Sequence, residues 1–185
     1  YAISIKDSKI ELNINFPKPL KNSFSNKLIG SFIYDISNKY STTQIDIDTS
    51  NKNILENTVL GFCQKDFIYS IYKKNSQKSI YQTNFKLSKI NSNTLQSINF
   101  LKELVSEPSN IIYPESFSFT AKKNINQSIV DIKILKKDKI KKIGLNCLLA
   151  VNQGSAKQPI VMEFSKKNHK KNVDILFVGK GVCFD

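Results

Sequence analysis

The sequence predicts an α/β protein in which helices and strands alternate along the chain. Apolar and polar residues alternate in short stretches such as 43–48, which is typical of strands with one wet face. In other stretches, such as 24–36, apolar residues recur every four positions, which is typical of helices. The last apolar run, residues 173–178, is almost unbroken and is typical of a strand buried on both faces of a parallel sheet.

The chain opens with strand patterns followed by a helix pattern. Residues 1–14 predict two short strands, separated by the polar residues 6–9. A helix capped by Ser23 is expected next, with Ile33 and Ile36 in the core. The stripe that predicts this helix consists of Phe24, Leu28, Phe32 and Ile36.

A strand, a helix and an edge strand are expected after this helix. Residues 43–48 predict the first strand, and residues 53–69 predict a second helix with an apolar face. The polar residues 73–82 separate that helix from an expected edge strand at 85–90. We therefore expect an N-terminal α/β domain with a mixed sheet over residues 1–93.

Residues 94–108 predict a helix that follows a domain boundary at residues 91–94. Thr94 is its expected cap, and Pro108 ends it because proline cannot continue a helix. Its apolar positions are Leu95, Ile98, Leu101 and Leu104, with Val105 beside them. Residues 109–185 then begin a second domain.

The second domain is also expected to alternate helices and strands. The apolar residues 145–151 are expected to be buried, and a polar loop at 165–172 is expected to precede the last strand. The other expected elements are a helix after Pro114, a strand at 129–135, a short helix at 139–143 capped by Gly144, and a strand at 160–164 introduced by Pro159.

The composition is strongly basic, with a formal net charge of +13. This charge points to an acidic partner. All 28 basic residues are lysine, however, and arginine is the side chain that suits bidentate contacts with phosphate and guanine. The chain is also rich in Asn and Ile, which like Lys have AT-rich codons, so coding bias explains the charge more simply. Nucleic-acid binding is therefore an alternative and is not favoured.

Cysteine content and hydropathy limit the class of protein. The three cysteines are an odd number without a C-x-x-C spacing, which favours free thiols and a reducing, cytoplasmic compartment. No apolar stretch has the length that spans a bilayer, and no signal-peptide pattern opens the chain. Because the chain begins at Tyr1 and ends at Asp185 in a strand-exit turn, we expect it to be a fragment of a longer protein.

The strongest candidate site lies at the end of the last expected strand. Gly179 and Gly181 allow a sharp backbone turn around Lys180, and ligands bind at the carboxyl ends of strands in open α/β sheets. Lys180 and Asp185 leave the strand end together. Their spacing fits an ordinary ion pair, and it also fits two side chains that face a metal ion.

Two other groups of residues are weaker candidates for a functional site. Asp46 and Asp48 share one face of a strand, but no His, Cys or Glu cluster joins them, so a solvated face is favoured over a metal site. His169 is the single histidine and lies among lysines in the polar loop. No His-based catalytic pair can be assembled, and we identify no catalytic residue in this chain.

Four stretches carry a resemblance to a known family. Residues 178–185, Val-Gly-Lys-Gly-Val-Cys-Phe-Asp, resemble the metal-binding signature of the leucyl (cytosol) aminopeptidases, peptidase family M17. Residues 104–110 and 148–155 resemble the same family in the expected order, and residues 56–62 resemble the end of its N-terminal domain. Cys183 departs from the pattern, because Thr often fills that position.

The resemblance implies a fold and an activity. It implies a macro-like N-terminal domain, a linker helix and the start of a catalytic domain. The family binds two divalent ions, Zn²⁺ or Mn²⁺, which activate a water that attacks the peptide carbonyl and bind the free N-terminal amine of the peptide substrate. By resemblance, Lys180 ligates one ion as a neutral amine and Asp185 bridges both.

The resemblance also limits what this chain does alone. The other metal ligands and the catalytic residues of the family lie beyond Asp185, so the chain by itself is expected to be inactive. The family is hexameric, which implies a homo-hexamer in the cytoplasm, without membrane contact. The alternative interpretation is a basic α/β module that binds nucleic acid or helps to assemble an oligomer.

Overall fold

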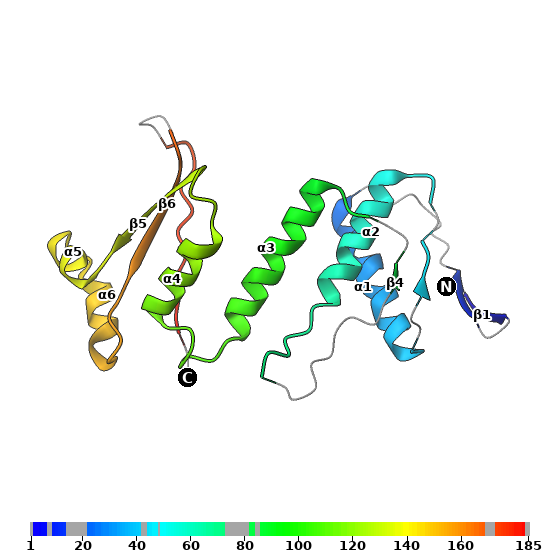
Figure 1. Ribbon diagram of the computed structural model, residues 1–185, viewed down its shortest axis with the longest axis horizontal. Helices are drawn as coiled ribbons and strands as arrows, with labels where there is room; N and C mark the ends of the chain where they lie inside the picture. The colour runs from blue at the N-terminus through cyan, green and yellow to red at the C-terminus, as the bar shows by residue number, and fades with distance from the viewer. Residues whose placement is uncertain are drawn as a thin grey trace. The chain divides into compact units, whose positions relative to one another are not determined.

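The computed structural model describes residues 2–6, 9–13, 22–41, 44–47, 49–72, 82–83, 86–168 and 173–183. The chain divides into two compact units, Tyr1–Glu103 and Leu104–Asp185 (Figure 1). Both units contain helices and two-stranded sheets, which confirms the α/β class. None of the helices in the described ranges is long and apolar enough to cross a bilayer.

The strands of the first unit pair in two places. The two short strands predicted at residues 1–14 are present as β1 (Ala2–Lys6) and β2 (Lys9–Asn13), and they pair as an antiparallel hairpin. The strands β3 (Gln44–Ile45) and β4 (Gln82–Thr83) pair in parallel. The strand predicted at 43–48 is therefore shorter than expected, and two of its residues, Thr43 and Asp48, lie outside the described residues.

Two helices, α1 (Ser23–Lys39) and α2 (Lys52–Lys65), form the core of the first unit. Their backbones approach closely at two glycines. A Cβ atom on Gly30 would lie 1.8 Å from the carbonyl oxygen of Thr58, and a Cβ atom on Gly61 would lie 2.0 Å from that of Lys27. The residues buried beside this crossing include Val59, Leu60 and Phe62. The contact therefore depends on the absence of side chains at both positions.

The buried face of α1 includes only part of the apolar stripe. Of the two residues expected in the core, Ile36 is buried and Ile33 is partly buried, whereas Phe24 and Leu28 of the stripe are 67% and 54% exposed. The buried face contains Asn26 and Gly30, because close backbone approach at the glycine selects the side that packs. The predicted cap is also wrong. Asn22 caps α1, with its side-chain oxygen accepting a 2.7 Å hydrogen bond from the backbone N–H of Ser25.

The helix α3 (Lys89–Ser106) begins earlier than predicted. Residues 86–88 are not a strand and residues 89–90 are helical, so the expected edge strand at 85–90 is wrong for the residues that the structure describes. Thr94 lies inside the helix, where its hydroxyl donates to the carbonyl of Ile90. The helix ends before Pro108, as expected.

Polar side chains hold α3 to α2 and to the segment after it. The Asn91 amide donates to the Glu56 carboxylate at 2.7 Å, near the first turn of α3. Further along α3, the Lys102 amine donates to the carbonyl of Gln64 and lies 5.3 Å from the ring centre of Phe67. Burial lowers the pKa of this amine. These contacts stabilise α3 and explain why the residues just before Thr94 are helical, although their pattern predicts a strand.

The second unit contains four helical segments and one sheet within the described residues. The strands β5 (Val130–Leu135) and β6 (Val161–Lys166) are antiparallel, with Leu135 opposite Val161. The helices are α4 (Pro114–Asn124), α5 (Lys137–Lys142), α6 (Asn146–Val151) and the 3₁₀ turn η1 (Asn152–Gly154). Ile140 is fully buried and Ala121 is 4% exposed, so these two side chains mark the small core.

Local signals predicted most of this unit correctly. Gly144 has a φ of 79°, the left-handed conformation expected of a residue that ends a helix. The burial expected at 145–151 is wrong, because no residue of α6 is buried and Val151 is 80% exposed. An apolar helix of six residues that packs on few neighbours cannot bury all of its sides.

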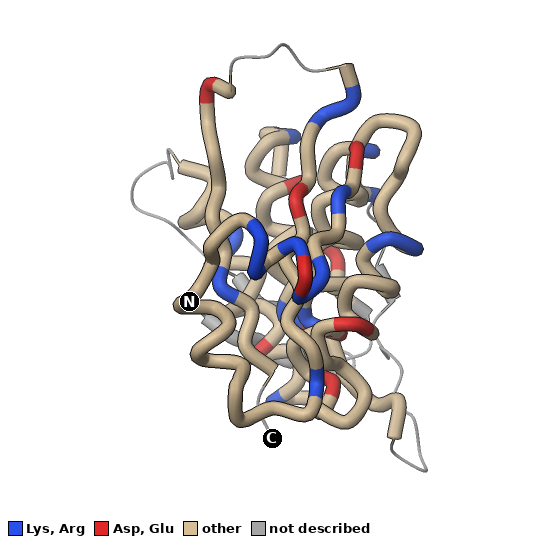
Figure 2. The backbone as a smooth tube through the Cα atoms, turned by 90° about the vertical axis from the view of Figure 1, so that its left-hand side faces the viewer, with Lys and Arg blue, Asp and Glu red and all other residues tan. Residues whose placement is uncertain are grey.

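The charged side chains are spread over many elements. In the view of Figure 2, blue basic positions and red acidic positions are interspersed along the tube. Two exposed ion pairs join Lys65 to Asp35 at 2.8 Å and Lys133 to Glu163 at 3.0 Å. The picture shows no separate basic stripe in this view, although the whole chain carries +13.

Candidate functional site

The segment that carries the candidate metal ligands is extended and exposed. Residues 173–183 contain no strand, so the buried parallel strand expected at 173–178 is wrong. Ile175 is 71% exposed, Phe177 is 89% exposed and Val178 is 88% exposed. The reason is physical, because a strand with two apolar faces forms only where other elements cover both faces and pair with its backbone.

The expected sharp turn around Lys180 is not present either. Neither Gly179 nor Gly181 has a positive φ, and a Cβ atom on either glycine would meet no atom within 4 Å. Lys180 is exposed. Asp185 lies outside the described residues, so the structure does not relate it to Lys180.

The described residues do not form a metal centre by themselves. No group of three or more His, Cys, Asp or Glu side chains gathers anywhere in the described ranges. Asp46 is exposed, and its predicted neighbour Asp48 lies outside the described residues, as does His169. A pair of divalent ions needs several carboxylate ligands, so the described donor set does not fit such a pair.

The motif at 148–155 has a structural role that the sequence did not reveal. The Asn152 side chain donates a 2.7 Å hydrogen bond to the carbonyl of Lys157, and the Ser155 hydroxyl accepts a 3.1 Å hydrogen bond from the backbone N–H of the same residue. The Lys157 amine lies 3.9 Å from the ring centre of Tyr113, at the start of α4. The motif thus fixes the loop that leads into β6.

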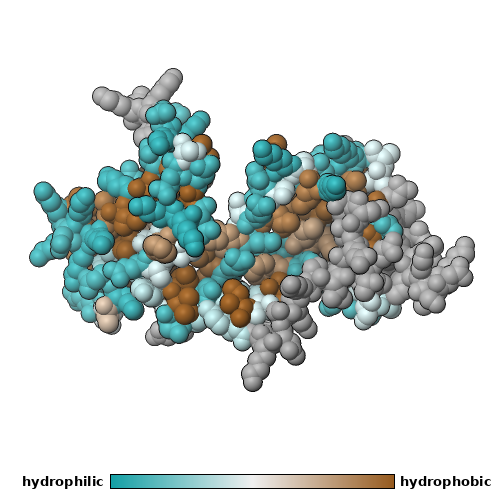
Figure 3. Space-filling model, viewed as in Figure 1, coloured by the Kyte–Doolittle hydropathy of each residue, from teal (hydrophilic) through white to brown (hydrophobic). Residues whose placement is uncertain are grey.

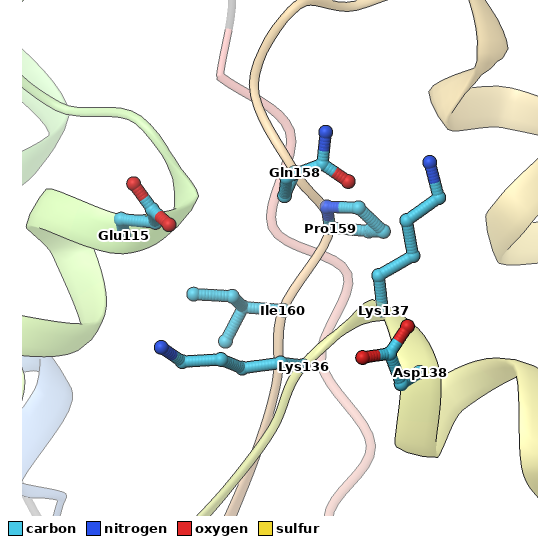
Figure 4. A pocket seen from close by; sticks show the side chains of 7 residues that line it. All are labelled: Glu115, Lys136, Lys137, Asp138, Gln158, Pro159 and Ile160. Carbon is cyan, nitrogen blue, oxygen red and sulfur yellow. The ribbon is translucent and has the colours of Figure 1, made fainter.

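A small hollow lies beside this loop. Its volume is about 260 Å³, and Figure 4 shows Glu115 of α4 across from Lys136 and Ile160. The other residues that line it are Lys137, Asp138, Gln158 and Pro159. The charged side chains are exposed, and the hollow is smaller than the roughly 300–1,000 Å³ of typical ligand pockets. We therefore assign it no ligand.

The three cysteines are free thiols. Cys63 is partly buried in α2, and burial is the main cause that raises the pKa of its thiol, with the carboxylate of Asp66 acting in the same direction. Cys147 and Cys183 are exposed. The absence of a disulfide among them agrees with the interpretation of the cysteine spacing.

Comparison with known proteins identifies the family. Residues 99–185 match the model of the catalytic domain of the cytosol aminopeptidase family. The Probable cytosol aminopeptidase of Phytoplasma mali is 34% identical over 158 residues, which cover 76% of this chain and 31% of that protein. The protein of the same name from Caulobacter vibrioides is 41% identical over 91 residues, or 48% of this chain and 18% of that protein. Over residues 99–185 the chain therefore resembles the catalytic domain of the cytosol aminopeptidase family.

A solved structure has a similar fold. A mutant of tomato leucine aminopeptidase matches with a TM-score of 0.62 and 16% sequence identity, over 87% of this chain and 38% of the tomato chain. At this identity the similarity shows the fold alone. The chain spans less than a third of the length of each of the two curated relatives named above.

The family match covers three of the four motifs noted in the sequence. Residues 104–110, 148–155 and 178–185 all lie within the matched stretch 99–185. In the structure the first two motifs lie at the end of α3 and in α6 and η1, and the described part of the third, residues 178–183, lies in the exposed segment.

Proposed function

We propose that this chain supplies part of a metal-dependent aminopeptidase that hydrolyses N-terminal residues from peptides. The observation that carries the proposal is the match of residues 99–185 to the catalytic domain of the cytosol aminopeptidase family. The names of the similar proteins point the same way, since the relatives from both bacteria are called cytosol aminopeptidases. The peptide substrate follows from this class of enzyme.

Lys180 and Asp185 are the proposed metal ligands of this chain. The support is the resemblance of residues 178–185 to the family's metal-binding signature. Lysine binds a cation only as the neutral amine, which requires burial or a nearby positive charge, and Lys180 is exposed. The ions, Mn²⁺ or Zn²⁺, would therefore be held only after further ligands and covering residues join this segment.

A first test uses the chain alone. We expect the 185-residue protein, supplied with Mn²⁺ or Zn²⁺, to hydrolyse a leucine amide no faster than buffer containing the same metal. The physical reason is that the described residues gather no set of three metal-binding side chains. Clear turnover by the isolated chain that a chelator abolishes would contradict the proposal that its site is incomplete.

A second test uses a fusion protein. We define the fusion as this chain extended at its C-terminus by the residues that follow the matched stretch in the Phytoplasma mali protein. We expect the fusion to release leucine from leucine amide. Lys180→Ala and Asp185→Ala should each reduce its kcat/KM by more than about 100-fold, since even indirect ligand partners are worth 10–100-fold. Lys166→Ala, an exposed lysine of β6, is the control and should change it little.

Three finer proposals concern domains, assembly and location. We place the N-terminal domain at residues 1–93, a linker helix at 94–108 and the start of the catalytic domain at 109–185. The boundary between the two compact units falls after Glu103, within α3, which supports a division in this region. By resemblance to the family we propose a homo-hexamer in the cytoplasm. Light scattering on the fusion tests the assembly, and a stable monomer would contradict it.

A further inference from the structure

The end of α5 combines lysines with exposed aliphatic residues. Five of the seven residues at 136–142 are lysine, and one is acidic. The last three of these lysines are exposed, and the first two aliphatic residues after the helix are 57% and 40% exposed. We define these five residues as the α5 patch, which consists of Lys139, Lys141, Lys142, Ile143 and Leu145.

The backbone holds the α5 patch together. Ile140 is fully buried, which fixes the side of α5 that faces the core. The chain reverses at Gly144, and the N–H of Leu145 donates a 3.2 Å hydrogen bond to the carbonyl of Ile140. Leu145 therefore lies beside the last turn of α5. In Figure 3, hydrophilic groups project where Figure 1 draws α5, and apolar groups reach the surface close to them.

The charge of the patch is not balanced by acidic residues nearby in the sequence. Residues 139–151 contain neither Asp nor Glu. The ion pairs found among the described residues join Lys65 to Asp35 and Lys133 to Glu163, and the patch lysines belong to neither pair. Coding bias explains how many lysines the chain has, but it does not explain why these adjoin exposed aliphatic side chains. The α5 patch thus joins positive charge to apolar surface.

An anionic lipid surface matches this combination. Lysine side chains near a membrane are attracted to its negatively charged headgroups. Aliphatic side chains enter the boundary between the headgroups and the acyl chains. The long stem of lysine lets its charged end stay among the headgroups while neighbouring apolar groups lie deeper. Both components of the patch therefore find a partner in the same surface.

Nucleic acid matches the patch less well. Single strands bind by stacking on aromatic side chains, and residues 136–151 contain none. Bidentate contacts with phosphate or guanine favour arginine, which the chain lacks. A phosphate backbone also offers no apolar partner for Ile143 and Leu145. The lysines alone would fit either polyanion, and the aliphatic residues favour lipid.

We propose that the α5 patch binds the chain to the surface of an anionic phospholipid membrane. The three lysines attract the headgroups, and Ile143 and Leu145 enter the headgroup region without any segment crossing the bilayer. This inference goes beyond the proposed aminopeptidase function and does not depend on it. It replaces the expectation, drawn from the family resemblance, that the chain makes no membrane contact.

The test is sedimentation of the 185-residue chain with lipid vesicles. Vesicles of phosphatidylserine and phosphatidylcholine in equal parts should bind the chain. Vesicles of phosphatidylcholine alone should bind it far more weakly, and added salt should weaken the binding to anionic vesicles because ions screen the charges. Equal binding to both kinds of vesicle, or no binding to the anionic ones, would overturn the proposal.

A matched pair of lysine variants separates the patch from the net charge of the chain. The patch variant carries Lys139→Ala, Lys141→Ala and Lys142→Ala. The control variant removes three exposed lysines of the first unit and carries Lys52→Ala, Lys86→Ala and Lys89→Ala. The patch variant should bind anionic vesicles about 100-fold more weakly, since each lysine near the membrane is worth about five-fold in affinity. The control should bind nearly as well as the natural chain, and equal losses would overturn the proposal.

A second pair of variants tests the apolar contact. Ile143→Ser combined with Leu145→Ser should weaken binding to anionic vesicles several-fold and should leave the binding of single-stranded DNA unchanged. Ile71→Ser combined with Ile90→Ser is the control, at sites that are 63% and 78% exposed, and should leave vesicle binding unchanged. Circular dichroism checks that each variant folds. Vesicle binding that survives the loss of both patch residues would overturn the proposed insertion.

Two further measurements distinguish the possible outcomes. If the natural chain binds single-stranded DNA through the patch lysines and does not bind anionic vesicles, the patch belongs to a nucleic-acid site and the proposal is overturned. The leucine amide assay on the fusion is independent of the vesicle assay. An active fusion together with a chain that ignores anionic vesicles would refute only this inference, whereas vesicle binding together with an inactive fusion would refute only the proposed function.

Discussion

Replacing Gly61 by alanine tests the close contact between α1 and α2. The new Cβ atom would lie 2.0 Å from the carbonyl oxygen of Lys27, whereas ordinary contacts begin at 3.4 Å. The nearest atoms are backbone, so the helices must move apart by about 1.4 Å. Overpacking of this kind costs about 1–3 kcal/mol, and the move also loosens the edge-to-face contact of Tyr34 with Phe62, whose ring centres are 5.5 Å apart.

The higher helix propensity of alanine acts in the opposite direction, so the sign of the change in stability shows which effect is larger. In an unconstrained helix, the change from glycine to alanine stabilises by about 1 kcal/mol. We expect Gly61→Ala to lower the free energy of unfolding by about 2 kcal/mol, measured by urea denaturation followed by circular dichroism. Gly154→Ala is the control, since a Cβ atom there meets nothing within 4 Å. If Gly61→Ala stabilised the protein, the close helix crossing would be wrong.

Three further predictions concern single side chains. Asn51→Ala should destabilise the first unit by about 1 kcal/mol in urea denaturation, because this side chain accepts hydrogen bonds from two backbone N–H groups at the start of α2; an unchanged midpoint would contradict the cap. Ile140→Ala should lower the free energy of unfolding by about 2–5 kcal/mol, since Ile140 is fully buried. Val151→Ala, at an 80% exposed site, should lower it far less. Equal losses in the two variants would refute the assigned core. Burial is the main cause that raises the pKa of the Cys63 thiol above its ordinary 9.0 in the folded protein. The neutral thiol therefore supports folding fully below pH 9, and this contribution to stability is lost as the pH rises through the higher folded pKa. Cys63→Ala should therefore show a smaller fall in stability above pH 9 than the natural chain, and identical pH profiles would contradict this.

Elements that depend on local signals were predictable from the sequence. The strands β1, β2 and β5 and the end of α5 before Gly144 all appear where the pattern places them. These features are set by alternation of side chains or by one glycine in a left-handed conformation, which neighbouring residues alone determine.

Features that depend on tertiary contacts were not predictable. The apolar stripe that predicts α1 includes Phe24 and Leu28, yet both are exposed, because the glycine contact turns another face of the helix toward α2. The start of α3 was missed because the amide of Asn91 is held by Glu56, which is distant in sequence. A residue pattern records which side chains are apolar, and it does not record which backbones approach closely.

The candidate site, like the fold, was predictable only in part. The pattern at 173–178 predicted a buried strand, but the structure has no strand there and leaves the apolar side chains exposed. Lys180 and Asp185 were chosen by resemblance, and they stay a prediction. No residue pattern indicated the hydrogen bond from the Asn152 side chain to the carbonyl of Lys157, in the loop before β6.

Metal content tests the central claim most directly, namely that Lys180 and Asp185 belong to a metal site that this chain starts and does not complete. The chain and the fusion are dialysed against Mn²⁺, freed of loose metal and analysed by mass spectrometry for bound ions. We predict two Mn²⁺ per fusion chain, clear loss of metal in the fusion with Asp185→Ala, and almost none in the chain alone. Two ions bound to the chain alone, or undiminished metal after Asp185→Ala, would contradict the account.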